Sequence, residues 1–81
     1  MNYNYCLRED ILFDENGEKY TVYGIDAIEL NNKVLQSFPD IFFSRQMGES
    51  FVKLCNMCEL ELIHLADAVE DILTEQYAIY T

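Results

Sequence analysis

The ten residues CNMCELELIH, at positions 55–64, hold the residue types best suited to metal or redox chemistry in this chain. Cys55 and Cys58 have the spacing of half a structural zinc site, and His64 follows them. Cys6 is the remaining cysteine and could complete a set of four ligands. The same cysteine spacing occurs in thiol redox motifs, in which a helix N-terminus lowers the thiol pKa. Two chemistries are therefore open, a zinc site and a redox pair.

Helical periodicity favours a third interpretation, in which the cysteines pack in the core. Five apolar side chains between positions 47 and 58 fall on one helical stripe: Met47, Phe51, Leu54, Cys55 and Cys58. Reduced cysteine behaves as a small hydrophobic residue and is often buried. A redox pair is disfavoured because the cysteines would lie at a helix C-terminus, where the dipole opposes a low thiol pKa. We predict core packing and no cofactor, with a zinc-stabilised domain as an alternative.

His64, Asp67 and Asp71 could line one side of a helix, which would suit acid–base catalysis or weak metal binding. We interpret His64 instead as a surface histidine near carboxylates. The sequence contains no Ser-centred nucleophile elbow, Gly-rich phosphate loop or HExxH motif. We therefore expect that the protein is not an enzyme.

Acidic residues gather in the last quarter of the chain: Glu59, Glu61, Asp67, Glu70, Asp71 and Glu75. They could dock a basic protein or mimic nucleic acid, as an inhibitor of a nuclease or defence system would. A solvated helix face that keeps the protein soluble is the simpler interpretation.

Residues 1–39 are predicted to form a three-stranded antiparallel meander, because apolar residues alternate with polar ones. Asn16-Gly17 predicts a two-residue hairpin turn, which would pair Phe13 with Tyr20 and Ile11 with Val22. This pairing fails near Gly24, where we predict a bulge. Asn31-Asn32 predicts the second turn. We expect Pro39 to end the third strand.

Two helices are predicted after the strands, over residues 44–58 with Ser44 as N-cap and over residues 61–75, followed by a tail at 76–81. The expected fold is α+β in a single domain over 1–81. It consists of the meander followed by two helices packed on one sheet face, in the order βββαα.

The alternation divides the sheet into two apolar faces. The helices are expected to cover the face with Tyr3, Tyr5, Ile11, Phe13, Val22, Ile28 and Leu35. The other face carries Leu12, Tyr23, Ile25, Val34 and Phe38, and the tail or a second chain would cover it. Phe42, in the stretch FPDIFF, is assigned to a core corner, with an exposed aromatic patch as the alternative.

Five basic and fifteen acidic residues give 5 − 15 = −10. This charge argues against binding nucleic acid or an anionic membrane directly. The N-terminus lacks the features of a signal peptide, and no apolar run approaches the roughly 18 residues of a membrane span. Three cysteines are an odd number, so we expect reduced thiols and a cytoplasmic location.

The segments YTVYGIDAIE, SFPDI and LIHLADAVEDIL together resemble a family of short uncharacterised bacterial proteins from anaerobic Gram-positive bacteria. The family is a domain of unknown function, so the resemblance implies a fold and no activity. It covers about residues 3 to 74. Phe42-Phe43 and the helix-one cysteines depart from the expected family pattern.

We expect a small acidic protein-interaction or regulatory module, acting as a homodimer or on a basic protein surface. Its alternatives are an acidic inhibitor that mimics nucleic acid and a zinc-stabilised domain. The candidate interaction residues are Tyr23, Ile25, Val34, Phe38, Phe42, Asp67, Asp71 and Glu75.

Overall fold

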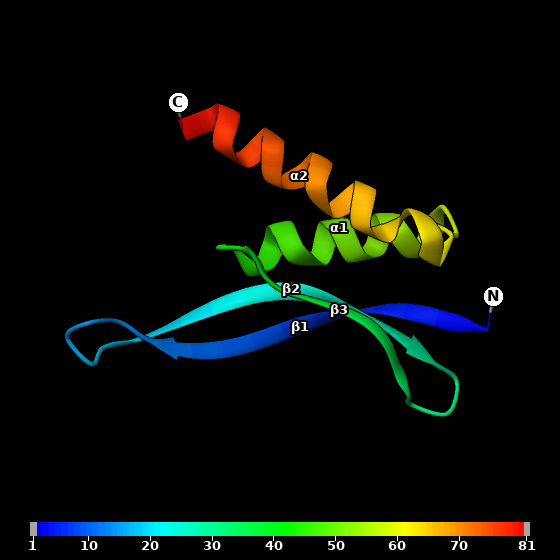
Figure 1. The fold of residues 1–81 in the computed structure, drawn as a ribbon, viewed down its shortest axis with the longest axis horizontal. Coiled ribbons are helices and arrows are strands. Elements are labelled where there is room, and N and C mark those ends of the chain that lie inside the picture. The colour runs from blue at the N-terminus through cyan, green and yellow to red at the C-terminus, as the bar shows by residue number, and fades with distance from the viewer. Residues whose placement is uncertain (1, 81) are drawn as a thin grey trace.

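The computed structural model describes the backbone of residues 2–80 and the side chains of residues 2–76. It has the predicted βββαα order, with a three-stranded antiparallel sheet and both helices on one side of it (Figure 1). The elements are β1 (Tyr3–Phe13), β2 (Lys19–Glu29), β3 (Val34–Phe42), α1 (Arg45–Met57), the 3-10 turn η1 (Leu62–His64) and α2 (Leu65–Tyr80). In the sheet β2 lies between β1 and β3, and α1 packs mainly against β1 and β2.

The first hairpin closes with a three-residue turn and not with the predicted two-residue turn. Asp14 donates its backbone N–H to the carbonyl of Glu18 (2.9 Å) and accepts from the N–H of Gly17 (3.0 Å). Its carboxylate also accepts from the N–H of Asn16 and of Glu18. Gly17 takes the left-handed conformation (φ 77°) that ends such a turn. The extra loop residue shifts the register by one, so Phe13 faces Lys19 and the predicted pairing is wrong.

The second hairpin repeats this turn. Asn32 is left-handed (φ 69°) and its N–H donates to the carbonyl of Glu29, as Gly17 does in the first turn. The prediction of a turn at Asn31-Asn32 is therefore confirmed. Across this turn Ile25 faces Phe38, and Ile28 faces Val34.

The predicted irregularity at Gly24 is present, but it lies between β2 and β3 and not between β1 and β2. A Cβ at Gly24 would stand 2.1 Å from the Phe38 carbonyl oxygen, so only glycine allows β3 to approach this closely. The prediction that Pro39 ends the third strand is wrong. Pro39 lies inside β3, next to Asp40, which takes a left-handed conformation (φ 57°) at the irregularity.

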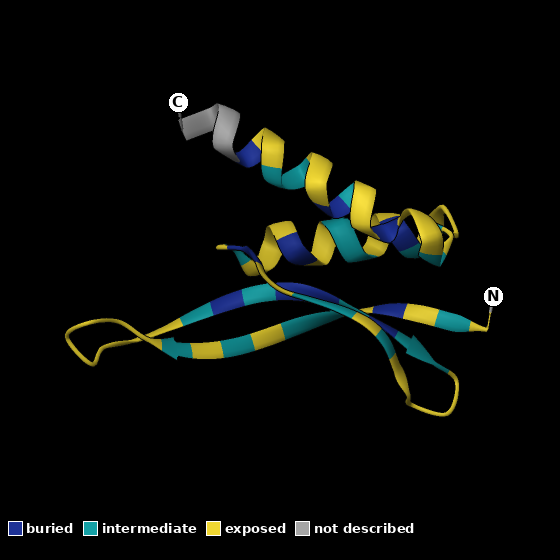
Figure 2. Ribbon diagram, viewed as in Figure 1, coloured by how far each residue is buried: buried dark blue, intermediate teal, exposed yellow. Residues whose placement is uncertain are grey.

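The core lies between the helices and the face of the sheet that carries Tyr5, Ile25 and Ala27 (Figure 2). The prediction of the covered face is wrong for Ile28, because the one-residue register shift sets Ala27 opposite Tyr5 and brings Ile25 onto the same face; Val22 is buried as predicted. The helix side also contributes Cys55, Leu65 and Val69. Ile11 and Phe13, which were predicted to be covered, are 61% and 63% exposed because the β1–β2 hairpin extends past α1 (Figure 1).

Helix α1 begins at the predicted cap, where the Ser44 hydroxyl accepts from the N–H of Met47 (3.4 Å). Its buried face is rotated from the predicted stripe. Gly48 and Cys55 are buried, while Met47 and Leu54 are exposed. The stripe turns toward Gly48 because the missing side chain brings the helix against the sheet, next to Leu7 and Phe42.

The second helical segment begins with η1, and α2 then continues beyond the predicted end at residue 75. Gln76 is buried and donates its side-chain N–H to the carbonyl of Ile41 (2.9 Å). The side chains of the predicted tail after Gln76 lie outside the described residues. None of the helices in the described part of the chain is long and apolar enough to cross a membrane.

Candidate functional site

The three cysteines do not share one buried environment. Cys55 is buried in the core, whereas Cys6 and Cys58 are exposed, so the prediction that Cys58 packs in the core is wrong. Cys58 is exposed because α1 ends at this residue, which serves as the C-cap. Burial, with a smaller contribution from Cys58, raises the pKa of the Cys55 thiol to about 11. Cys55 therefore stays protonated at neutral pH and is a poor nucleophile or metal ligand.

Metal binding finds no geometric support in the described side chains, residues 2–76, which contain no group of three His, Cys, Asp or Glu residues placed to hold an ion. His64 lies in η1 and is exposed, with its Nε2 4.0 Å from a carboxylate oxygen of Glu61. Among the described side chains the ion-pair contact of His64 is with Glu61, and no hydrogen bond or ion pair joins it to Asp67 or Asp71.

Residues 55–64, which have the composition of a metal site, instead form hydrogen bonds to Tyr3 and Tyr5 of β1 and so connect the helical segments to the outer edge of this strand. The Asn56 side chain accepts from the Tyr5 backbone N–H and donates to the Tyr5 carbonyl, both at 2.9 Å. A side-chain amide has the same donor and acceptor pair as a backbone amide. Asn56 therefore pairs with β1 in the way that a neighbouring strand would.

Two tyrosines complete this attachment. The Tyr5 hydroxyl donates to the Leu60 carbonyl (2.6 Å), and the Tyr3 hydroxyl accepts from the N–H of Leu62 (2.8 Å). The two rings stand edge to face with centroids 5.8 Å apart. Burial is the main cause that raises the pKa of Tyr5 to about 12, with further contributions from Tyr3 and Cys55. The hydroxyl therefore remains a donor at neutral pH.

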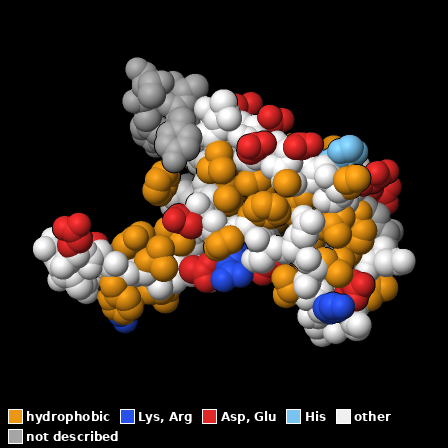
Figure 3. Space-filling model, in the orientation of Figure 1, with side chains coloured by type: hydrophobic (Ala, Val, Ile, Leu, Met, Phe, Trp, Pro, Cys, Tyr) orange, Lys and Arg blue, Asp and Glu red, His pale blue; other side chains and the backbone are white. Residues whose placement is uncertain are grey.

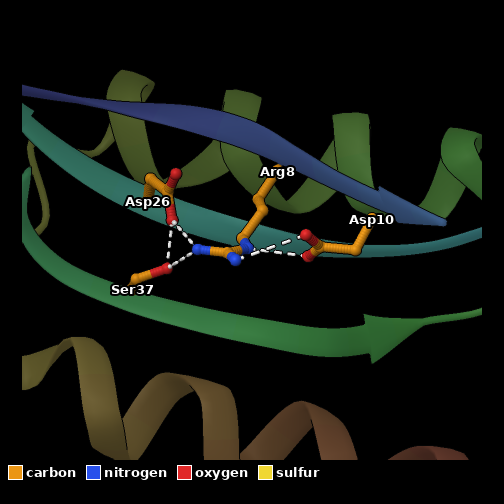
Figure 4. Close-up of polar contacts among 4 residues, drawn as sticks. All are labelled: Arg8, Asp10, Asp26 and Ser37. Carbon is orange, nitrogen blue, oxygen red and sulfur yellow. Dashed lines mark hydrogen bonds and ion pairs between the residues drawn. The ribbon is translucent and has the colours of Figure 1, made fainter. Parts of the chain in front are cut away.

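A polar cluster lies on the sheet face away from α1 (Figure 4). Arg8 donates to the carboxylate of Asp10 (2.7 and 3.3 Å) and to the Ser37 hydroxyl (2.7 Å). Ser37 in turn donates to Asp26. The hydrogen bonds to Asp10 are the main cause that raises the pKa of Arg8. The guanidinium contacts residues of all three strands, since it also lies 3.8 Å from Asp26, so this cluster links the strands of the sheet.

A groove of about 390 Å³ runs between α1 and α2. We call it the helix groove; its lining residues are Phe42, Gln46, Met47, Ser50, Phe51, Leu54 and Ile72. Phe42 and Phe51 pack against each other with ring centroids 5.4 Å apart. Met47 and Leu54 are 43% and 58% exposed. Figure 3 shows hydrophobic side chains gathered over this region.

Acidic residues border the helix groove along α2. The α2 segment contains four acidic residues and no Lys or Arg. Asp67, Asp71 and Glu75 are all exposed and follow at intervals of four residues, so they form a row with a rise of about 6 Å between members. Glu75 is the i+3 neighbour of Ile72, which brings the row to the edge of the groove. Figure 3 shows acidic side chains beside the apolar region on this face.

Comparison with protein families matches residues 1–75 to a family of unknown function, DUF6514. The chain belongs to this family. No curated protein and no solved structure matches it. Membership agrees with the resemblance to a domain of unknown function in YTVYGIDAIE, SFPDI and LIHLADAVEDIL, and it carries no activity.

The predicted interaction residues of this family member are divided between core and surface. Ile25 and Phe42 are fully buried, and Tyr23 and Phe38 are partly buried against the core. They cannot form the second apolar face that was predicted, because the register shift directs them toward the helices. Burial of Phe42 agrees with its assignment to a core corner.

The remaining predicted residues are on the surface: Val34 is half exposed, and Asp67, Asp71 and Glu75 are exposed. Sequence reasoning missed Asn56 and the exposure of Leu54. The sequence did offer a signal for Asn56, because it is a polar residue directly after Cys55, which was predicted to be buried. Leu54 could not be recognised, since its exposure depends on the rotation of α1.

Proposed function

We propose that this chain is a protein-interaction module that binds an apolar and basic segment of a partner protein in the helix groove. The observation that carries the proposal is the exposure of Met47 and Leu54 over an aromatic floor of Phe42 and Phe51. A groove with exposed large apolar side chains is typical of a surface that receives the apolar face of a helix.

The charge of α2 supports a basic partner. The acidic row of Asp67, Asp71 and Glu75 has no basic residue within α2 to neutralise it. A partner with Lys or Arg flanking its apolar residues would be attracted to this edge and oriented by it. A second copy of the same surface would be repelled, since it would bring two acidic rows together.

The acidic row gives less support to mimicry of nucleic acid. Its charges are about 6 Å apart along the helix axis. Each strand of duplex DNA carries one phosphate per about 3.4 Å of axis, roughly twice this density. The free cysteines are typical of a reducing compartment, so we propose a cytoplasmic location.

The proposal can be tested with a synthetic amphipathic peptide of about four helical turns that has a Leu face and a Lys face. Isothermal titration would compare the wild type with Leu54→Asn. The matched control is Leu30→Asn, because Leu30 is 76% exposed in the β2–β3 turn, away from the helix groove. We expect Leu54→Asn to weaken binding about fivefold or more, since one apolar anchor contributes on the order of 1 kcal/mol or more.

A second pair of variants tests the charge contribution. Asp71→Asn should weaken peptide binding at low salt and have little effect at high salt, where the attraction is screened. Glu15→Gln, in the first turn, is the control. It removes the same one unit of charge and should leave the affinity for the peptide nearly unchanged at both low and high salt. Equal affinities for Leu54→Asn and Leu30→Asn would mean that the peptide binds only through the overall negative charge, and the helix groove would be rejected as the site.

A further inference from the structure

The outer edge of β1 has backbone groups that the rest of the described chain leaves unpaired. The Tyr5 N–H and carbonyl point away from β2, because both bond to Asn56. Asp14, nine residues later, bonds inward to Glu18 across the hairpin. Backbone groups along an antiparallel edge strand alternate between the two directions. The outward residues of β1 beyond Tyr5 are therefore Leu7, Glu9, Ile11 and Phe13, and no hydrogen bond joins their backbone groups to another part of residues 2–76.

The opposite edge of the sheet does not offer a similar surface. There β3 contains Pro39, a left-handed Asp40 and two changes of register against β2. Such interruptions prevent the regular addition of another strand. By contrast, β1 pairs with β2 over all eleven residues without a shift, so its outer edge is regular.

The side chains along the open part of β1 are also apolar and accessible. Ile11 and Phe13 are 61% and 63% exposed, and they lie in the part of the hairpin that extends past α1 (Figure 1). A long regular edge with exposed apolar side chains is a template for pairing with another strand.

The charges beside this edge are closer to balance than those of α2. Arg45 contacts Glu49 (2.8 Å) and Glu9 (3.2 Å), and Arg8 contacts Asp10 (2.7 Å). Two arginines against these three carboxylates leave one excess negative charge, whereas α2 has four acidic residues and no Lys or Arg. Two copies can therefore approach along β1 with less repulsion than α2 would cause.

We propose that β1 pairs antiparallel with β1 of a second copy about a two-fold axis at Asp10, so that the two sheets join into one. This register sets Leu7 against Phe13 of the partner subunit and Glu9 against Ile11 of the partner subunit. The four outward residues are symmetric about Asp10, so the pairing satisfies the open groups of both copies at once. Self-complementarity of this kind favours a second copy over an unrelated peptide. Each Asp10 meets its symmetry mate while bound by its own Arg8.

Size-exclusion chromatography with light scattering over about a hundredfold range of concentration should show a monomer–dimer equilibrium. Hydrogen exchange then identifies the interface. The amides of Leu7, Glu9, Ile11 and Phe13 should become protected as the dimer forms. The amides of the even-numbered residues between them already bond to β2 and serve as internal controls.

Ile11→Glu should shift the protein to the monomer, because the proposed register sets the new carboxylate against Glu9 of the partner subunit in both halves of the dimer. Leu30→Glu is the matched control, and circular dichroism of both variants checks that each is folded. A wild type that stays monomeric at every concentration overturns the proposal. So does a dimer whose four amides exchange as fast as in the monomer, a result that does not depend on any variant. Leu54→Asn should leave the dimer intact, so failure of the helix groove and failure of this interface are distinguishable.

Discussion

Replacing Asn56 with alanine should lower the free energy of unfolding by about 2 kcal/mol. The substitution removes two hydrogen bonds of 2.9 Å to the Tyr5 backbone, each worth about 1 kcal/mol net, and leaves two partly buried backbone groups without partners at a cost of up to about 1 kcal/mol more. The higher helix propensity of alanine offsets roughly 0.5 kcal/mol of this loss. The free energy of unfolding of a domain of this length is about 4–12 kcal/mol in total, so the variant should fold but be clearly less stable than the wild type.

Urea denaturation followed by circular dichroism measures this loss. With a slope of about 1 kcal/mol per molar urea for a small domain, the midpoint should fall by about 2 M. Gln46→Ala is the matched control, because Gln46 is an exposed residue of α1 that makes no contact with β1 among the hydrogen bonds of residues 2–76. Its midpoint should change by no more than about 0.5 M.

Asn56→Asp refines the same test. The introduced carboxylate still accepts from the Tyr5 N–H, but it faces the Tyr5 carbonyl oxygen where Asn56 donated. At neutral pH this variant should be at least as unstable as Asn56→Ala. Protonation supplies a donor, so part of the lost stability should return as the pH falls through the range in which the carboxyl group is protonated. If Asn56→Ala and Gln46→Ala have the same midpoint, the pairing of Asn56 with β1 contributes nothing and the reasoning is refuted.

Three further predictions concern other parts of the fold. Gly24→Ala should prevent folding or cost more than about 3 kcal/mol, because its Cβ would meet the Phe38 carbonyl oxygen at 2.1 Å; a normal thermal melt would contradict this packing. Alkylation of the native protein at pH 8 should add two groups by intact mass and a third only in denaturant, since Cys55 alone is buried and its thiol pKa is about 11. The pKa of Tyr5 is raised in the folded state, so its contribution to stability is complete below its unfolded pKa of about 10 and is lost as the pH rises through about 12. In Tyr5→Phe the urea midpoint should therefore fall less steeply than in the wild type as the pH rises over this range. If the two proteins show the same pH dependence, other groups cause the loss of stability at alkaline pH.

Much of the architecture could be predicted because it depends on local signals. The alternation of apolar residues predicted three strands, Asn32 predicted the second turn, and Ser44 predicted the start of α1. Each signal acts within a few residues of the chain, through side-chain alternation, left-handed backbone or capping. The order βββαα follows from these signals without reference to any long-range contact.

The register of the first hairpin shows where local reasoning fails. Asn16-Gly17 suits both a two-residue turn and the last two residues of a three-residue turn, and the choice depends on hydrogen bonds to Asp14. A difference of one residue moves Ile25 from the outer face to the core. The predicted set of exposed interaction residues was wrong at Ile25 for this reason.

The candidate site was predicted less well than the fold because it depends on how elements pack. The acidic residues of α2 are evident in the sequence, and their exposure follows from helical periodicity. The helix groove is not evident, because the exposure of Leu54 and Met47 depends on the rotation of α1 set by Gly48 against the sheet. The open edge of β1 likewise depends on where α1 begins and how far the hairpin extends past that end of the helix (Figure 1).

CNMCELELIH illustrates the division between sequence and tertiary structure. The sequence alone determines that a helix ends there and that cysteine, asparagine and histidine are close along the chain. Only the tertiary structure decides that Cys55 is buried, that Cys58 and His64 face solvent, and that Asn56 pairs with the backbone of Tyr5, fifty-one residues earlier. The physical reason is that periodicity specifies which residues share a side of one element, whereas contacts between elements depend on register and rotation, which small residues and turns set across the whole fold.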